Sequence, residues 1–312
     1  MGSCARFSLR DVVFDAGECT WSYAHTRIRF GAYRGTRVAV KQASLVRAAR
    51  EDTSAAACAR LRAEAAALRV VGRHPGIVRL LALDEAGDEG LVSLVTEECG
   101  AGTLGAPSLP GLPLRSLRAL GELAAALAHV HARGVVHRDV KPCNVLLAAR
   151  SGAVQVRLSD FDRATRSGAS LALGGGALSV GTMLFMAPEL LRAEAAAGEA
   201  AAGEAAPALP ALPAAPALDA YSFGITAFQV IERREPYQHL NLAPGCPDSL
   251  SRRDFGHAVA AHGLRPAWDP RLEIEEGAAA LAQARALVEL CWAQDPAERP
   301  PMARLAAALR TL

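Results

Sequence analysis

The chain has 312 residues, of which 51% are hydrophobic and 21% are charged. It is long enough to bury one large core or two smaller ones, and its composition excludes a collagen-like or peptide-sized chain. The formal net charge is only +2, so bulk charge indicates neither a nucleic-acid partner nor an anionic membrane surface. Any partner must therefore be inferred from a specific site.

The cysteines and the apolar runs bear on the cellular compartment. There are seven cysteines, and none are spaced as Cys-x-x-Cys, which argues against a disulfide framework or a structural zinc site. No apolar run reaches the roughly 20 residues of a spanning helix, and the N-terminus lacks the layout of a signal peptide. We therefore expect a cytoplasmic or nuclear protein with no transmembrane segment.

The N-terminal tail, residues 1–9, resembles the start of an acylated protein. Gly2 stands where a myristoyl group would attach and Cys4 where a palmitoyl group would attach. The myristoylation motif has Ser or Thr at the sixth position, however, and this chain has Arg6 there. We expect an ordinary disordered tail, with lipidation as the alternative.

The first part of the chain predicts a small mixed α and β lobe. Apolar and polar residues alternate on both sides of a turn at Arg34-Gly35, which predicts a hairpin over residues 27–40. Ala, Leu and Arg then follow at helical spacing over residues 54–71 without Gly or Pro. Two further strands are predicted over residues 77–83 and 91–96.

The second part predicts mainly helices. A Gly- and Pro-rich link at residues 105–113 precedes a helix at residues 114–132, which has leucines along one side. Residues 192–218 repeat Ala, Gly and Glu and then alternate Ala, Leu and Pro, with no aromatic residue. We expect this segment to be an exposed, disordered spacer, with a docking segment as the alternative.

Polar residues with the chemistry of phosphoryl transfer cluster between a helix and an apolar strand. Asp139, Lys141 and Asn144 lie within the segment His-Arg-Asp-Val-Lys-Pro-Cys-Asn, and Asp160 follows the next strand. Asn144 and Asp160 carry the hard oxygen atoms that Mg²⁺ prefers. Asp139 would accept or orient a hydroxyl proton, and Lys141 would balance charge on a transferring phosphoryl group.

These segments resemble the catalytic loop and, as Ser-Asp-Phe-Asp, the Asp-Phe-Gly segment of eukaryotic protein kinases. Val-Ala-Val-Lys at residues 38–41 resembles the strand whose Lys contacts the ATP phosphates, and Glu64 is placed like the ion-pair partner of Lys41. Lys141 and Thr182 resemble the serine/threonine kinases, which implies a protein substrate with a Ser or Thr acceptor. The amino-acid sequence around residues 94–104 resembles that of the Mos and Raf group of kinases.

Later motifs extend the resemblance over about residues 10–312. Ala-Pro-Glu at residues 187–189 resembles the end of an activation segment, and the family would pair Glu189 with Arg299. The resemblance implies an α+β, bilobal protein kinase fold, with a small, mainly antiparallel β N-lobe carrying one main helix and a larger, mainly α-helical C-lobe. The expected boundaries are an N-lobe at 10–96, a hinge at 97–100 and a C-lobe at 101–312.

The resemblance also implies an ATP site. The base would lie between apolar side chains, with Thr96 at the gatekeeper position and backbone groups of residues 97–99 at the edge of the base. The side chains or backbones expected at the nucleotide belong to Lys41, Ile28, Ala39, Thr96, Glu97, Cys99 and Leu146.

The sequence departs from the family at two places. The three glycines of the family's phosphate loop would fall at Trp21, Tyr23 and Thr26, and Asp162 replaces the Gly of Asp-Phe-Gly. Glycines let that loop approach phosphates with its backbone N–H groups. We therefore expect an active serine/threonine kinase with weakened ATP affinity. The alternatives are a pseudokinase scaffold and a kinase acting on small molecules.

Overall fold

The computed structural model describes residues 7–16, 20–22, 26–44, 51–85, 91–105, 113–150, 153–171, 180–201, 215–238, 240, 250–270 and 278–312. Gly2, Cys4 and Tyr23 lie outside these ranges. The chain forms two compact units, residues 1–102 with 146–164 and residues 103–145 with 165–312. The first is built on an antiparallel sheet and the second is mainly helical, which confirms the predicted α+β fold class.

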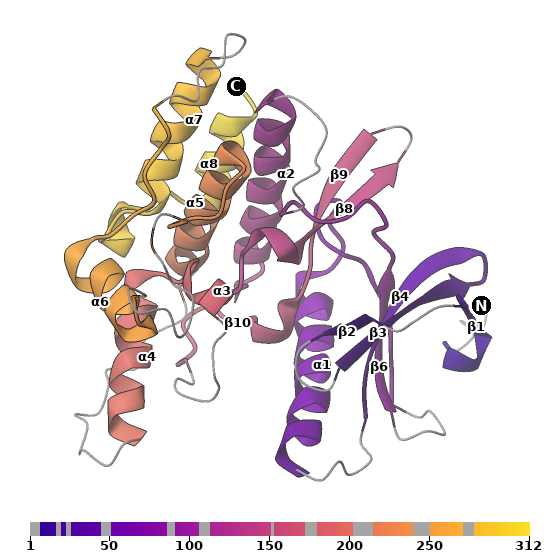
Figure 1. Cartoon of the computed structure of the whole chain (residues 1–312). Helices are drawn as coiled ribbons and strands as arrows, with labels where there is room; N and C mark the ends of the chain where they lie inside the picture. Colours follow the sequence, from indigo (N-terminus) through magenta and orange to yellow (C-terminus); the bar gives the residue numbers. More distant parts are fainter. Residues whose placement is uncertain are drawn as a thin grey trace. The chain divides into compact units, whose positions relative to one another are not determined.

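The sheet of the first unit has the strand order β1-β3-β4-β6-β5, and β2 pairs with β3 (Figure 1). All of its pairings are antiparallel. Its strands are β1 (Val12–Phe14), β2 (Thr20–Ser22), β3 (Thr26–Tyr33), β4 (Thr36–Ser44), β5 (Leu80–Asp84) and β6 (Leu91–Glu97).

The predicted hairpin is confirmed as β3 and β4. Tyr33 pairs with Thr36, so the turn consists of Arg34 and Gly35 alone. Both turn residues have positive φ, 50° and 78°, as a two-residue hairpin turn that follows the strand twist requires. Gly35 adopts this conformation without a steric cost, whereas Arg34 is one of the few non-glycine residues that does so.

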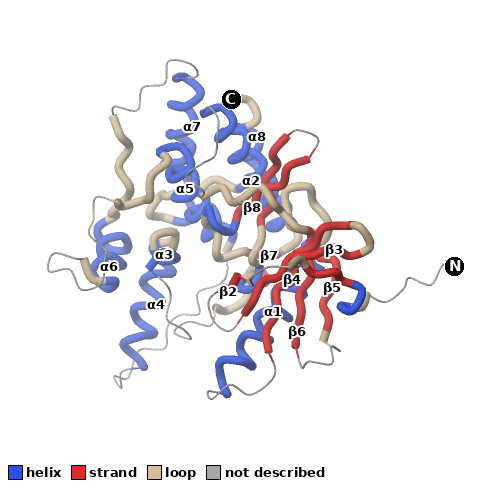
Figure 2. Tube along the Cα trace, turned by 45° about the vertical axis from the view of Figure 1, so that its right-hand side comes forward, coloured by secondary structure: helices blue, strands red, loops and turns tan. Residues whose placement is uncertain are grey.

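The predicted helix of the first unit is confirmed as α1 (Glu51–Val71), and it packs on one face of the sheet. Ala43 of β4 and Leu94 of β6 bury their side chains against this helix. Side chains of β4 alternate between the two faces, so Val38 and Val40 point the other way, into a separate small core with Val12. Figure 2 shows α1 beside the strands.

A second hairpin, β8 (Val145–Arg150) with β9 (Ala153–Leu158), joins the first unit from residue 146 onward. The sequence predicts that all residues from 101 onward belong to the C-lobe, whereas residues 146–164 group with the first unit. Backbone hydrogen bonds explain the difference, because Val78 N donates to Leu158 O at 2.9 Å and Leu158 N donates to Gly76 O at 2.8 Å. These bonds tie the end of β9 to the segment that follows α1.

The second unit is organised around helix α5 (Pro216–Glu232), which is buried along most of its length. Gly224 lets α7 approach, since a Cβ at this position would lie only 2.9 Å from the Cβ of Cys291. The other helices are α2 (Pro113–Ala132), α3 (Val180–Met183), α4 (Pro188–Ala201), α6 (Arg252–His262), α7 (Ala278–Cys291) and α8 (Met302–Leu309). A short pair of strands, β7 (Val135–Val136) and β10 (Thr165–Arg166), completes the unit.

The expected spacer at residues 192–218 is partly helical. Helix α4 continues to Ala201, and α5 begins at Pro216. Arg192 is also held in place, because its guanidinium donates to the backbone oxygen of Ala260 at 2.6 Å. The expectation of disorder is therefore wrong for residues 192–201, whose Ala-rich composition favours a helix, and residues 202–214 lie outside the described ranges.

Among the helices that the structure describes, none combines the length and apolar character needed to span a bilayer.

Candidate active site

Lys41 of β4 is the centre of a charged cluster in the first unit. Its Nζ lies 3.0 Å from Oε2 of Glu64 on α1 and 2.8 Å from Oδ1 of Asp160. Asp160 immediately precedes the short 3₁₀ helix η3 (Phe161–Arg163), which packs against α1 through the buried ring of Phe161. The structure thus brings together three residues that the sequence analysis selected from three distant segments.

Burial and neighbouring charges shift the pKa values of this cluster in opposite directions. Burial by itself would lower the pKa of Lys41, but the charges of Glu64 and Asp160 outweigh it, so the pKa of the ammonium is raised. Burial raises the pKa of Glu64, which is 4% exposed, against the lowering effect of the Lys41 charge. Lys41 is therefore held as a cation in a site with two carboxyl groups.

Asp160 and Asp162 differ in backbone conformation. Asp160 has φ 62° and ψ 63°, in the left-handed region, which Asp tolerates better than most residues. Asp162, which replaces the expected Gly, lies inside η3, and its φ is not positive. The substitution therefore introduces no backbone strain in this conformation. Its charge adds to those that raise the pKa of Glu64.

A second polar cluster surrounds Asp139 in the second unit. Oδ2 of Asp139 accepts a hydrogen bond from Nζ of Lys141 at 2.7 Å and another from Nδ2 of Asn144 at 2.9 Å. Lys141 also donates to Oγ1 of Thr182 at 3.0 Å. These residues were predicted to act together, and the structure joins them in one hydrogen-bonded network in which Asp139, Asn144 and Thr182 are buried.

Asp219 of α5 holds the backbone of this loop, a role that the sequence analysis did not assign. Its carboxylate accepts the backbone N–H groups of His137 at 2.8 Å and Arg138 at 2.7 Å, and it lies 2.8 Å from Nε2 of His131. Arg138 has φ 69°, a conformation that costs a non-glycine residue about 1–3 kcal/mol. The hydrogen bonds that the charged Asp219 carboxylate accepts offset this cost and fix the direction of the loop.

The residues expected around the nucleotide base share one face of the sheet. In the strand register Ile28 lies opposite Lys41, and Ala39 lies opposite Thr96. Ala39 and Lys41 are two positions apart on β4, so all four side chains point to the same side. Glu97 is one residue further on, and its side chain points to the other side.

The carboxylate of Glu97 serves the structure of the first unit. Oε1 accepts the backbone N–H of Arg79 at 3.0 Å and lies 3.4 Å from Nε of Arg157. The Glu97 side chain is therefore not the group expected at the base. The predicted contact with the base would be made by the backbone of residues 97–99.

Leu146 and Cys99 complete the predicted nucleotide contacts, and both are half-buried in the first unit. Strand β8 runs beside the segment after Cys99, because Ala101 N donates to Leu147 O at 3.0 Å and Leu147 N donates to Gly102 O at 2.9 Å. This pairing places Leu146 beside residues 101–102, in the segment that follows β6.

The segment expected to act as the phosphate loop forms part of an ordinary antiparallel pair. Trp21 of β2 lies opposite Arg27, and Ser22 lies opposite Thr26. Thr26 is 5% exposed. The described part of this segment thus presents side-chain-bearing residues where the family has glycines.

Glu189 and Arg299 form the ion pair that the resemblance implied. Two guanidinium nitrogens of Arg299 donate to the two carboxylate oxygens of Glu189, at 2.7 Å and 2.8 Å. Such a two-pronged arrangement is the strongest form of this pair. It links the start of α4 to the segment before α8.

Asn144 and Asp160 fit Mg²⁺ by the chemistry of their donor atoms. Each side chain offers an oxygen ligand, and Mg²⁺ at nucleotide sites uses few protein ligands beside phosphate oxygens and water. Nδ2 of Asn144 donates to Asp139, which identifies Oδ1 as the side-chain acceptor atom; Oδ1 also accepts a weak hydrogen bond from Sγ of Cys143 at 3.7 Å.

Comparison with known proteins places the chain in a family. Residues 27–308 match the family model described as "Protein kinase domain". The serine/threonine-protein kinase mos of Xenopus laevis is 32% identical over 284 residues, covering 86% of this chain and 67% of that protein. The serine/threonine-protein kinase mos of Gallus gallus is 28% identical over 193 residues, covering 61% of this chain and 45% of that protein.

A bacterial relative shows similarity of the same order. The serine/threonine-protein kinase pkn2 of Myxococcus xanthus is 30% identical over 228 residues, and the match covers 68% of this chain but 25% of that protein. The chain thus spans between a quarter and two thirds of these relatives. The similarity to two mos kinases agrees with the resemblance found in the sequence. Since the family model matches most of its length, the chain belongs to the protein kinase family.

Proposed function

We propose that this chain is a serine/threonine protein kinase that transfers the γ-phosphate of ATP to Ser or Thr hydroxyls of protein substrates, in the cytoplasm or nucleus. The observation that carries the proposal is the position of Lys41, whose ammonium lies 3.0 Å from Glu64 and 2.8 Å from Asp160. Family membership supports it, because the matched relatives are named as serine/threonine kinases.

The first unit would bind the nucleotide. Lys41, kept cationic by its two carboxylates, would contact the α and β phosphates, and Glu64 would hold the Lys41 side chain in place. Ile28 and Ala39 would contact the base from the same face of the sheet, beside Thr96. Leu146 and the backbone of residues 97–99 would contact the base from β8 and the end of β6.

The second unit would position the acceptor hydroxyl. Asp139 would accept the hydroxyl proton or orient that hydroxyl, because its carboxylate is fixed by Lys141 and Asn144. Lys141, which Thr182 holds through a 3.0 Å hydrogen bond, would place a positive charge near the transferring group. Catalysis of phosphoryl transfer depends mostly on such positioning and electrostatics.

Asn144 and Asp160 would hold Mg²⁺ through their side-chain oxygens. When bound, the ion supplies charge neutralisation at the nucleotide phosphates. Asp139 assists by orienting the Asn144 amide, and the Lys41 ammonium assists by holding one oxygen of Asp160.

A pseudokinase scaffold is the second candidate, and one observation favours it. The buried Thr26 and the strand residue Trp21 occupy positions where glycines would bring backbone N–H groups to the phosphates. A chain with this segment would bind ATP weakly or not at all, and would act through contacts with partner proteins.

A thermal-unfolding titration with Mg·ATP separates the two candidates. A nucleotide at 100 times its Kd adds about 2.7 kcal/mol to the free energy of unfolding. We expect wild-type protein and Asp139→Asn to show a shift at millimolar Mg·ATP, because Asp139 faces the hydroxyl acceptor. Asp160→Asn should show a smaller shift. If Mg·ATP did not shift the melting temperature of the wild-type protein, the kinase function would be excluded and the pseudokinase scaffold would remain.

A further inference from the structure

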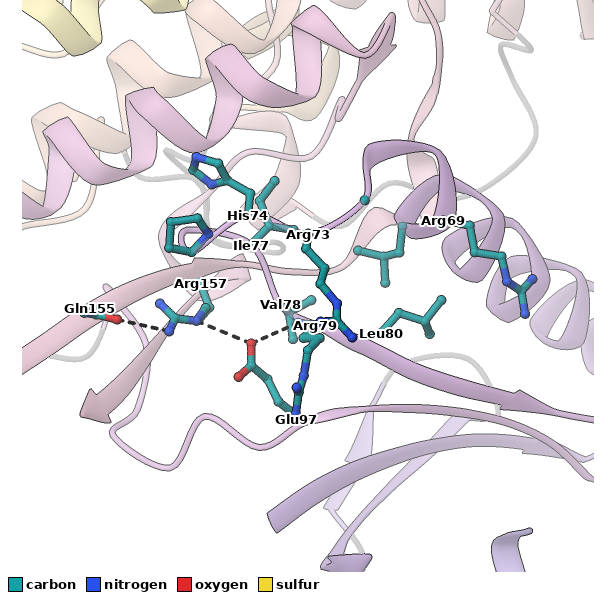
Figure 3. A pocket seen from close by; sticks show the side chains of 13 residues that line it. Arg69, Arg73, His74, Ile77, Val78, Arg79, Leu80, Glu97, Gln155 and Arg157 are labelled. Carbon is teal, nitrogen blue, oxygen red and sulfur yellow. Dashed lines mark hydrogen bonds and ion pairs between the residues drawn. The ribbon is translucent and has the colours of Figure 1, made fainter. Parts of the chain in front are cut away.

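The first unit contains a pocket of about 550 Å³. It lies between the end of α1, residues 72–78 and the strands β5 and β9 (Figure 3). Its volume falls within the roughly 300–1,000 Å³ that ligand sites occupy. Among the residues expected to contact nucleotide, Glu97 alone also lines this pocket. The pocket is therefore a separate site.

The side chains that line this pocket are mostly positively charged. It has a single carboxylate in its lining, that of Glu97. Against this carboxylate stand the four guanidinium groups of Arg69, Arg73, Arg79 and Arg157.

Glu97 is paired with Arg157, one of these four arginines. Its Oε1 lies 3.4 Å from Nε of Arg157 and also accepts the backbone N–H of Arg79 at 3.0 Å. Arg157 is further engaged, since it donates to the backbone oxygen of Val156 and to Oε1 of Gln155. Arg157 and Glu97 thus form a buried ion pair in the wall of the pocket (Figure 3).

The remaining three guanidinium groups have no acidic partner within the described ranges. Arg69 and Arg73 are exposed, and their guanidinium groups make no hydrogen bond or ion pair to any described residue. Nε of Arg79 is buried and also lacks a hydrogen-bond partner there. A buried donor left unpaired is unfavourable. An anion entering the pocket would satisfy this donor.

Aliphatic side chains line the same pocket. Leu68 at the end of α1, Val78 before β5 and Leu80 within β5 all contribute to the lining. Figure 3 shows Arg73 and Arg79 nearer to Glu97 than Arg69, which lies farther away on the helix. A lining that combines cations with aliphatic groups suits an anionic group carried on a peptide better than a free, fully hydrated ion.

We propose that this pocket binds a phosphorylated Ser or Thr side chain within a segment of a partner protein. A phosphate carries about −1.5 to −2 charges and three acceptor oxygens, which matches several unpaired guanidinium groups better than one carboxylate does. Arg73 and Arg79 bind the phosphate through their planar N–H forks. Arg69 adds charge at the rim, and the aliphatic wall contacts the neighbouring residues of the peptide.

The test is a peptide array probed with the purified full chain. The array presents peptides with a central phosphoserine and varied neighbours, each beside the same peptide with serine, and Kd values of bound sequences are then measured by fluorescence polarisation. We expect phosphoserine peptides to bind at least about tenfold more tightly than their serine counterparts. Arg73→Ala with Arg79→Ala should abolish this preference. Arg304→Ala with Arg310→Ala, which removes the same charge from exposed positions in α8 and directly after it, should not change it.

Three results would overturn the proposal. They are equal binding of phosphorylated and unphosphorylated peptides, full binding by the double pocket variant, and displacement of the peptide by inorganic phosphate at the same concentration as peptide. Because Arg79 is half-buried, the exposed Arg73→Ala alone serves as a second variant that keeps the fold, and it should weaken binding severalfold. The assay contains no nucleotide, so its outcome is independent of the proposed kinase activity.

Discussion

Lys41 and Asp160 are 119 positions apart, yet the ammonium of one lies 2.8 Å from a carboxylate oxygen of the other. Sheet, helix and hairpin of the first unit all contribute to this contact, because Lys41 is on β4, Glu64 is on α1 and Asp160 follows β9. The contact therefore depends on the whole unit being folded.

Lys41→Met should lower the free energy of unfolding by about 3 kcal/mol, because it leaves Glu64 buried without its cation. The double variant Lys41→Met, Glu64→Gln should recover at least half of this loss, since the uncompensated carboxylate is then neutral. Urea unfolding of the wild type and the two variants measures both effects. A Lys41→Met protein as stable as the wild type would show that the pair makes no net contribution.

The variant Asp219→Asn tests whether Asp219 stabilises the loop that carries Asp139, and the quantity measured is the pH dependence of the unfolding free energy. Burial alone would raise the pKa of Asp219, but the hydrogen bond and charge of His131, together with the charge and backbone N–H of His137, outweigh it, so the pKa is lowered. A carboxyl group with a lowered pKa in the folded state stabilises the protein above its unfolded pKa of about 3.9. That contribution disappears as the pH falls through the lower, folded value.

The wild type should therefore lose stability below about pH 4 more steeply than Asp219→Asn does. At neutral pH the variant should be less stable by about 3 kcal/mol, since hydrogen bonds to a charged group are lost. The exposed Asp295→Asn, which keeps its capping ability at η4 (Pro296–Glu298), is the matched control and should follow the wild type. If the unfolding free energies of Asp219→Asn and the wild type changed in parallel with pH, the lowered pKa of Asp219 would be contradicted.

Gly224→Ala tests the close packing of α5 against α7. The new Cβ would lie 2.9 Å from the Cβ of Cys291 and 3.3 Å from the oxygen of Val288, so a helix must shift. We expect a loss of about 1–3 kcal/mol, as for other overpacked cores. Gly121→Ala is the control, because its nearest contact is 3.6 Å, to Leu309, and it should be neutral or stabilising by up to about 1 kcal/mol. Equal melting temperatures for the two variants would contradict the packing described.

The sequence predicts the parts of this molecule that depend on local pattern. The hairpin around Arg34-Gly35 follows from alternation and a turn signal, and α1 follows from helical spacing. The candidate residues were found because Lys41 and Asp139 each occur within a short segment whose residue types resemble one family.

Three features could not be read from the sequence, because each depends on contacts between distant residues. The role of Asp219 is one of them, since only its bonds to the backbone N–H groups of His137 and Arg138 show that it holds the loop that carries Asp139. The hairpin of β8 and β9 joins the first unit through Leu158, which pairs with residues 76–78. The basic pocket combines residues from α1, β5 and β9 that share no motif.

The central claim is that this chain transfers phosphate through Asp139, and the most direct measurement is transfer from radiolabelled ATP to generic protein acceptors. Asp139→Asn is compared with Asp254→Asn, an exposed position at the start of α6, after both variants are shown to melt as the wild type does. We predict label on serine and threonine for the wild type and Asp254→Asn, and a loss of at least about a hundredfold for Asp139→Asn. Unchanged transfer by Asp139→Asn would contradict the account.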